Sequence, residues 1–78
     1  MIIDIRDSSK YLKGHLKDAI NISFLELYLH PERHLKKNMK YLLYCDSGVK
    51  SKILVSYLNR CGYHCVNMDG GYANYLFK

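Results

Sequence analysis

The sequence is poor in several residue types whose abundance would define a protein class. It has no tryptophan, one proline, five glycines and only seven acidic residues against twelve lysines and arginines. The low glycine and proline content excludes collagen-like and low-complexity chains, and 49% hydrophobic residues exclude a disordered one. The 78 residues are therefore predicted to form a single domain, 1–78, with a small core.

Long apolar runs are also absent. No run approaches the ~20 consecutive apolar residues that a membrane-spanning helix needs. Residues Met1–Arg6 have no basic segment ahead of an apolar stretch and no small-residue cleavage site, so they do not resemble a signal peptide. We therefore expect a cytoplasmic protein that has no contact with a membrane.

Cysteines are few, and their number is odd. Cys45, Cys61 and Cys65 occur without a secretory context, which argues against a disulfide framework. Cys61 and Cys65, with His64 between them, have too few accompanying ligands to indicate a metal site. We expect these two cysteines to be packing or incidental residues, and we expect no bound metal.

Negative charge is scarce, so the formal net charge is +5. The basic residues are scattered along the chain, as on a solvated surface, but an excess of this size also attracts small anions or an acidic partner protein. No pattern of interleaved aromatic and basic residues and no helix-turn-helix pattern is present, so nucleic-acid binding is disfavoured.

What is present is an alternation of short apolar segments with helical ones. Strands are predicted at Met1–Ile5, Ala19–Ile22, Lys40–Tyr44 and Tyr63–Met68, and the third is apolar enough to be buried on both faces. Helical segments separate these strands, which is typical of an α/β protein with a small parallel sheet flanked by helices. In such sheets ligands bind beyond the carboxyl ends of the strands.

The helical segments have recognisable ends. Asp7 or Ser8 would cap a helix that continues to about Lys13 and ends at Gly14, and Ser23 would cap another over Phe24–His30. Further helical segments are expected at Glu32–Lys37, after Pro31, and at Tyr72–Phe77, after an Asp-Gly-Gly turn. The strongest helical pattern ends before Gly62, and its predicted apolar face is Ile53, Leu54, Tyr57, Leu58 and Cys61.

Cys45 stands where the third strand ends and this helix begins. Unpaired backbone N–H groups at a helix start favour a thiolate, the reactive form of cysteine. Gly48 would let the loop curve around the sulfur, and Lys50 and Lys52 would add positive potential. Asp46 would oppose ionisation unless it points outward, as we expect. Position alone favours a reactive thiolate and an ordinary core cysteine about equally.

Four segments together resemble the single-domain rhodanese family of sulfurtransferases. IIDIRDSSKY is similar to its first aspartate-arginine segment and GHLKDAINIS to its second segment. YLLYCDSGVKS resembles its active-site loop, and CGYHCVNMDGGYANY resembles its closing segment. The four occur in the family's order over nearly the whole chain, which makes the resemblance strong although each segment alone is weak.

The resemblance implies that Cys45 is a nucleophile that carries sulfur as a persulfide, without any cofactor. It implies a thiosulfate or persulfide donor and a thiol or cyanide acceptor, so the expected partners are a small anionic sulfur compound or an acceptor thiol protein. Lys50 stands where many members have arginine. The residues expected to form the persulfide-binding loop are Asp46, Ser47, Gly48, Val49 and Lys50, with Asp4, Arg6 and Ser51 in supporting positions.

The chain departs from the family in lacking the usual first strand and helix. The Met1–Ile5 strand is then expected to lose a neighbour and expose an edge, which a homodimer would cover. Two alternatives remain open. One is a non-catalytic, truncated binding module. The other is a phosphatase or arsenate reductase of the same fold, but these need arginine six residues after the cysteine, where this chain has Ser51.

Overall fold

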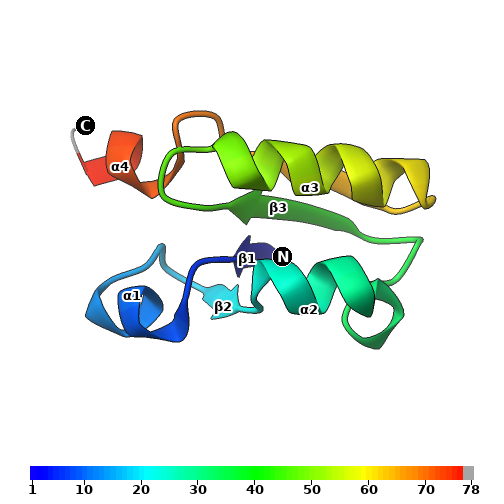
Figure 1. Cartoon of the computed structure of the whole chain (residues 1–78), viewed down its shortest axis with the longest axis horizontal. Helices are drawn as coiled ribbons and strands as arrows, with labels where there is room; N and C mark the ends of the chain where they lie inside the picture. The colour runs from blue at the N-terminus through cyan, green and yellow to red at the C-terminus, as the bar shows by residue number, and fades with distance from the viewer. Residues whose placement is uncertain (77–78) are drawn as a thin grey trace.

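A computed structural model describes residues 1–76, in which four parallel strands form one sheet. The strand order is β2-β1-β3-β4 (Figure 1). The strands are β1 (Ile2–Asp4), β2 (Ala19–Asn21), β3 (Lys40–Tyr44) and β4 (His64–Asn67). The prediction of an α/β fold with a small parallel sheet is confirmed, and each predicted strand is present, three of them shorter than expected.

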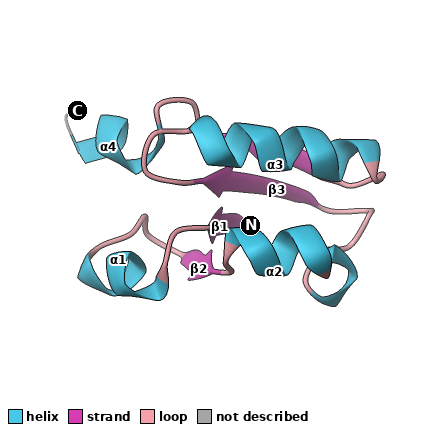
Figure 2. Ribbon diagram, in the orientation of Figure 1, coloured by secondary structure: helices cyan, strands magenta, loops and turns pink. Residues whose placement is uncertain are grey.

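Helices lie between successive strands, and a last helix follows β4 (Figure 2). They are α1 (Ser8–Lys13), α2 (Phe24–Leu29), a 3-10 turn (Pro31–Arg33), α3 (Val49–Arg60) and α4 (Gly71–Leu76). As predicted, Ser23 caps α2, because its hydroxyl accepts a hydrogen bond from the Glu26 N–H.

Two predictions about the helices need correction. Asp7 precedes α1, but its side chain makes no capping hydrogen bond. The turn expected at Glu32–Lys37 is the shorter 3-10 turn that starts at Pro31, because proline suits a first helical position. The part of the predicted last helix at residue 77 lies outside the described residues.

Strand β1 is not an edge of the sheet, contrary to expectation. Ile3 pairs with Ile20 of β2 on one side and with Leu43 of β3 on the other. The connection through α1 returns the chain to the side of β1 that faces away from β3, so β2 is the second neighbour of β1. The edges of the described sheet are therefore β2 and β4, and a dimer through β1 has no exposed edge to use.

The main core lies between the sheet and the pair α2 and α3. Fully buried side chains come from all three, namely Ile3, Leu27, Leu43, Leu54 and Leu58. Ile53, predicted to face this core, is instead 61% exposed. The buried stripe of α3 is centred on residues 54 and 58, so position 53 faces solvent beside the end of β3.

None of the helices within residues 1–76 has the length and apolar character needed to cross a bilayer. Because the four strands are parallel, their carboxyl ends lie at the same end of the sheet. Arg6 lies just beyond β1, Cys45 directly follows β3, and Asn67 ends β4. This convergence builds the candidate site.

Candidate active site

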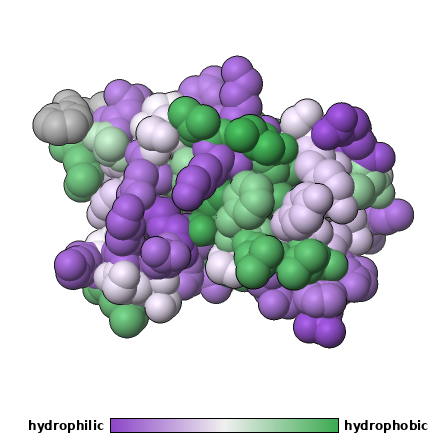
Figure 3. Space-filling view, in the orientation of Figure 1, coloured by the Kyte–Doolittle hydropathy of each residue, from purple (hydrophilic) through white to green (hydrophobic). Residues whose placement is uncertain are grey.

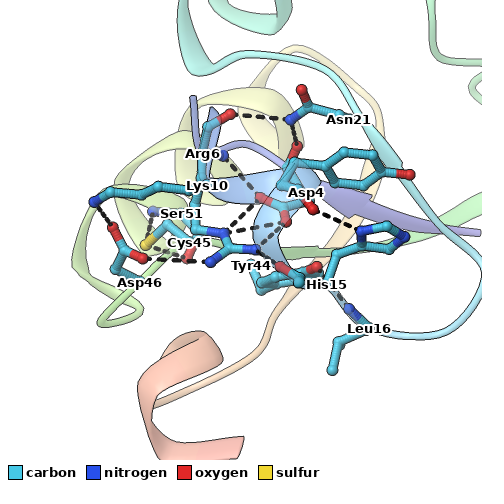
Figure 4. Close-up of polar contacts among 12 residues, drawn as sticks. Asp4, Arg6, Lys10, His15, Leu16, Asn21, Tyr44, Cys45, Asp46 and Ser51 are labelled. Atoms are coloured by element: carbon cyan, nitrogen blue, oxygen red, sulfur yellow. Dashed lines mark hydrogen bonds and ion pairs between the residues drawn. The ribbon is translucent and has the colours of Figure 1, made fainter. Parts of the chain in front are cut away.

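The sulfur of Cys45 lies at the start of α3 and accepts backbone hydrogen bonds. The N–H of Gly48 donates to it at 3.2 Å. The N–H of Ser51 donates to it at 3.4 Å (Figure 4). The Ser51 hydroxyl oxygen lies 3.3 Å from the same sulfur. Only 6% of Cys45 is exposed, so these donors act on a largely desolvated sulfur.

Gly48 makes the curvature of this loop possible. Its φ of 88° is in the left-handed region that glycine adopts without strain. A Cβ at this position would lie 2.8 Å from the backbone nitrogen of Gly70. The helix begins at the next residue, Val49, and the N–H of Ser51 in its first turn donates to the Cys45 sulfur.

These contacts set the pKa of Cys45 below that of an ordinary cysteine. Burial alone would raise the pKa, but hydrogen bonds from Ser51, through both its hydroxyl and its N–H, and from the Gly48 and Ser47 backbone outweigh burial. Cys65, in β4, has no such donors, and burial raises its pKa to about 11. The arrangement around Cys45 therefore favours the thiolate more than the surroundings of Cys65 do.

The first residues of α4 hold the Cys45 loop in place through backbone hydrogen bonds. The N–H groups of Tyr72 and Ala73 donate to the carbonyls of Cys45 and Asp46 at 2.8 and 2.9 Å. Gly71 has a φ of 64°, and a Cβ on it would lie 2.5 Å from the Cys45 carbonyl oxygen. The sequence predicts only a turn at Gly70 and Gly71, yet Gly71 also allows α4 to approach the Cys45 backbone closely.

Asn67 is a site residue that sequence reasoning missed. Its Oδ1 accepts from the Ser51 hydroxyl at 2.5 Å, and its Nδ2 donates to the Gly48 carbonyl at 3.2 Å. It therefore fixes both residues that donate to the Cys45 sulfur. Nothing in the sequence singles out an asparagine at the end of a strand for this position.

Asp4 and Arg6 form a buried ion pair beyond β1. Arg6 Nη2 lies 2.7 Å from Asp4 Oδ2, and its Nε lies 3.0 Å from Oδ1. Burial would raise the pKa of Asp4, but the hydrogen bonds from Arg6 outweigh it and lower the pKa. The guanidinium also donates to the Gly14 carbonyl and lies 4.2 Å from the centre of the Tyr72 ring.

Asp46 extends away from the core and is compensated by two cations. Its carboxylate lies 3.6 Å from Arg6 Nη1 and pairs with Lys10 of α1, which sequence reasoning also missed (Figure 4). The carboxylate is half-exposed. Its charge is therefore directed at two cations.

A cavity of about 630 Å³ opens in front of Cys45. Ser47, Val49 and Lys50 border it from the loop and the first turn of α3, and Phe24 and Leu25 border it from α2. The remaining lining residues include Ile5, Arg6, Asp7, Lys10, Ser23, Asp46 and Ile53. Lys52 does not line it.

Comparison with known proteins agrees with this geometry. A family model described as a rhodanese-like domain matches residues 1–78. The chain belongs to the rhodanese-like domain family. The resemblance to this family is thereby confirmed.

Curated relatives of this rhodanese-like chain include proteins with sulfurtransferase names. YtwF of Bacillus subtilis (strain 168), a sulfurtransferase by name, is 31% identical over 72 residues, which cover 90% of this chain and 67% of YtwF. The tRNA sulfurtransferase of Shewanella halifaxensis is 38% identical over 66 residues, 81% of this chain but 14% of that protein. A tRNA uridine(34) hydroxylase from a witches'-broom phytoplasma is 30% identical, and the matched part is 26% of its length. The chain thus spans about two thirds of YtwF and a small part of the other two.

Solved structures share the fold. A rhodanese-related protein from Thermoplasma volcanium superposes with a TM-score of 0.87 at 26% identity, covering 97% of this chain and 75% of that one. A rhodanese-like domain protein from Staphylococcus aureus gives a TM-score of 0.80 at 30% identity, covering 90% and 68%.

Proposed function

We propose that this rhodanese-like chain is a sulfurtransferase that carries sulfane sulfur as a persulfide on Cys45. The donor is thiosulfate or a persulfide, and the acceptor is a thiol or cyanide. Relatives with sulfurtransferase names support this class of activity. The observation that carries the proposal is the Cys45 sulfur itself, which accepts hydrogen bonds from the N–H groups of Gly48 and Ser51 at the start of α3.

In the first half-reaction the Cys45 thiolate attacks the outer sulfur of thiosulfate. A sulfur–sulfur bond forms to Cys45, the sulfur–sulfur bond of thiosulfate breaks, and sulfite leaves with the electron pair. The N–H groups of Gly48 and Ser51 stabilise the thiolate before attack. The lowered pKa of Cys45 increases the share of the ionised form, so the proposed mechanism uses no separate base.

In the second half-reaction an acceptor thiolate or cyanide attacks the outer sulfur of the persulfide. The bond to Cys45 breaks, and the Cys45 thiolate is restored with its electron pair. The outer sulfur extends from Cys45 toward the cavity, where Ser47, Val49 and Lys50 border it. Two separated transfers through one covalent intermediate predict ping-pong kinetics.

Lys50 is proposed to attract the anionic donor. It lines the cavity, is exposed, and forms no ion pair with any residue in the range 1–76. Lysine acts as a point charge without the paired donors of arginine, so it would attract thiosulfate without fixing its orientation. Asp4 and Arg6 act indirectly, by supporting the loop that carries Asp46. The proposed compartment is the cytoplasm, where free thiols persist.

The proposal is tested by intact-protein mass spectrometry after incubation with excess thiosulfate. The expected result is a gain of one sulfur atom that cyanide or a small thiol removes. Cys45→Ser should show no gain, and Cys61→Ser should gain sulfur like the unmodified protein. Absence of a gain with both thiosulfate and an organic persulfide, in a protein shown to be folded, would favour a non-catalytic binding module.

A further inference from the structure

The cavity in front of Cys45 is larger than its proposed inorganic substrate requires. Cavities of about 300–1,000 Å³ hold ligands of drug size, and thiosulfate is far smaller. The 630 Å³ cavity also has an apolar side, formed by Ile5, Phe24, Leu25, Val49 and Ile53, that an inorganic anion would leave unused. The lining therefore fits an occupant with apolar groups.

Apolar side chains around the cavity mouth are unusually exposed. Leu25 of α2 and Val49 and Ile53 of α3 are 63%, 62% and 61% exposed. Figure 3 shows apolar side chains gathered on the face that α2 and α3 form. Contiguous patches of exposed apolar side chains mark interaction sites or ligand grooves, whereas isolated exposed apolar residues are ordinary.

This apolar surface continues beyond the cavity. Phe24 stacks on Tyr28 of the next turn, and the Tyr28 ring lies 4.7 Å from that of Tyr57 in α3. Leu29 lies one turn beyond Leu25 and is also exposed. We call this continuous patch the α2–α3 surface; its residues are Phe24, Leu25, Tyr28, Leu29, Val49, Ile53 and Tyr57.

The extent of the α2–α3 surface favours a protein over a small molecule as the occupant. A small thiol inside the cavity would contact Leu25 and Ile53 but leave Tyr28 and Leu29 in water. A protein that places one protruding cysteine in the cavity would cover both parts at once. Such a cysteine must protrude, because Cys45 is 6% exposed and lies at the bottom of the cavity.

The charged residues around the α2–α3 surface indicate the charge of the partner. Lys50 borders the cavity, and neither it nor Lys52 pairs with a carboxylate in the described part of the chain. The Asp46 carboxylate is already compensated by Arg6 and Lys10. A second copy of this chain, with its net charge of +5, would bring two positive rims together.

We infer that the α2–α3 surface docks an acidic protein whose protruding cysteine exchanges sulfur with Cys45. This inference rests on the proposed sulfurtransferase function and adds the partner. Apolar residues beside the partner's cysteine cover Leu25, Val49 and Ile53, and flanking carboxylates face Lys50 and Lys52. Sulfur passes between two cysteine sulfurs, so each transfer forms one sulfur–sulfur bond and breaks another.

The test measures docking without requiring a persulfide. Synthetic peptides with one cysteine are activated as 2-thiopyridyl disulfides, and the Cys45 thiolate displaces pyridine-2-thione, which is followed by its absorbance. One peptide has leucines beside the cysteine and glutamates outside them. The second replaces the glutamates with lysines, the third replaces the leucines with serines, and activated glutathione represents a small thiol. Cys45→Ser provides the background rate.

The leucine–glutamate peptide is expected to react at least tenfold faster than the other three probes. Its advantage over the lysine peptide should shrink at high salt, because screening weakens exposed charge pairs. Ile53→Ser and Leu29→Ser should each reduce its rate several-fold. Leu12→Ser, a matched change of an exposed leucine on α1, should not.

Three results would overturn the inference. Equal rates for all peptides would show that the surface does not select, and activated glutathione reacting as fast as the leucine–glutamate peptide would indicate a small-molecule site. A dimer in sedimentation that Ile53→Ser converts to a monomer would assign the surface to a second copy. Failure of sulfur loading with selective disulfide exchange would instead reject the proposed function alone.

Discussion

The hydroxyl oxygen of Ser51 lies 3.3 Å from the sulfur of Cys45, the residue six positions before it. The Ser51 hydroxyl donates its hydrogen to Oδ1 of Asn67, 2.5 Å away. Because that hydrogen is used, a Cys45 thiol donates to the Ser51 oxygen. When the thiol ionises, the hydroxyl is placed to turn toward the sulfur. Ser51 thus stands where a cysteine phosphatase would have arginine, and it contacts the Cys45 sulfur through its hydroxyl and its N–H.

Ser51→Ala should slow the alkylation of Cys45. Loss of the hydroxyl removes a hydrogen bond that lowers the pKa of Cys45, so less thiolate is present at neutral pH. A hydrogen bond to a charged group contributes about 1.5 kcal/mol, which corresponds to a roughly tenfold lower rate at pH 7. The measurement is the iodoacetamide rate between pH 5 and 10, which should shift to higher pH.

Ser56→Ala is the matched control, because Ser56 lies on α3 with an exposed side chain. It should leave the pH profile unchanged. An unshifted profile for Ser51→Ala would mean that the backbone N–H groups alone stabilise the thiolate.

The two buried cysteines, Cys45 and Cys65, should differ sharply in their rate of alkylation. Cys45 has a lowered pKa because hydrogen bonds outweigh its burial, whereas burial raises the pKa of Cys65 to about 11. At pH 7 a limiting amount of iodoacetamide should therefore modify Cys45 well before Cys65, at least tenfold faster. Peptide mapping by mass spectrometry after short exposures gives both rates, and similar rates would contradict the described environment of Cys45.

Gly71→Ala should destabilise the protein and disturb the loop. The new Cβ would lie 2.5 Å from the Cys45 carbonyl and 2.6 Å from that of Asp46, and φ is 64°. Strain at a left-handed residue costs about 1–2 kcal/mol, and displacement of the loop adds to it, so we expect a loss of about 3 kcal/mol in urea unfolding.

Gly62→Ala separates the two contributions. Gly62 has a φ of 99°, but a Cβ there would meet only the Lys37 side chain at 3.5 Å. This variant should show the backbone strain alone and retain the Cys45 alkylation rate. Equal stability losses in the two glycine variants would refute the role of Gly71 in seating the loop.

Asp4→Asn should destabilise the protein because it removes the buried charge that pairs with the Arg6 guanidinium and leaves only the half-exposed Asp46 carboxylate, 3.6 Å away. Breaking a buried pair in this way costs about 3–5 kcal/mol. The pKa of Asp4 is lowered in the folded protein, so its contribution to stability is present above its ordinary pKa of 3.8 and is lost as pH falls through the folded value. The variant should therefore lose less stability than the unmodified protein on acidification below about pH 4.

Urea unfolding at several pH values measures this difference. Asp18→Asn is the control, since Asp18 is exposed, and it should follow the unmodified protein at every pH. A fall in stability on acidification as steep for Asp4→Asn as for the unmodified protein would show that other carboxylates govern acid unfolding.

Much of the fold was predictable because its signals are local. The Lys40–Tyr44 strand is a continuous apolar run, Ser23 caps α2, and proline ends that helix, each through chemistry within a few residues. The cysteine loop was predictable for the same reason, since Cys45, Gly48 and the start of α3 are close in sequence. Their spacing places the loop at the start of α3, and Asn67 and Gly71 from distant segments then hold it in place.

Contacts between distant segments were not predictable. Asn67 reaches Ser51 only because β4 lies beside β3, and Lys10 meets Asp46 only because α1 lies near the same end of the sheet. Ile53 is exposed because the buried stripe of α3 is centred on residues 54 and 58, and which side of the helix meets the core is decided by tertiary packing.

The sequence by itself determined the alternation of strands and helices and the position of a cysteine where a strand meets a helix, because hydrophobic periodicity and turn residues act locally. Tertiary structure decided that β1 is central, that Gly71 must be small, and that an apolar surface adjoins the sulfur. These properties arise from strand order and from close approaches between segments far apart in the chain. A single sequence does not encode such distances in any short pattern.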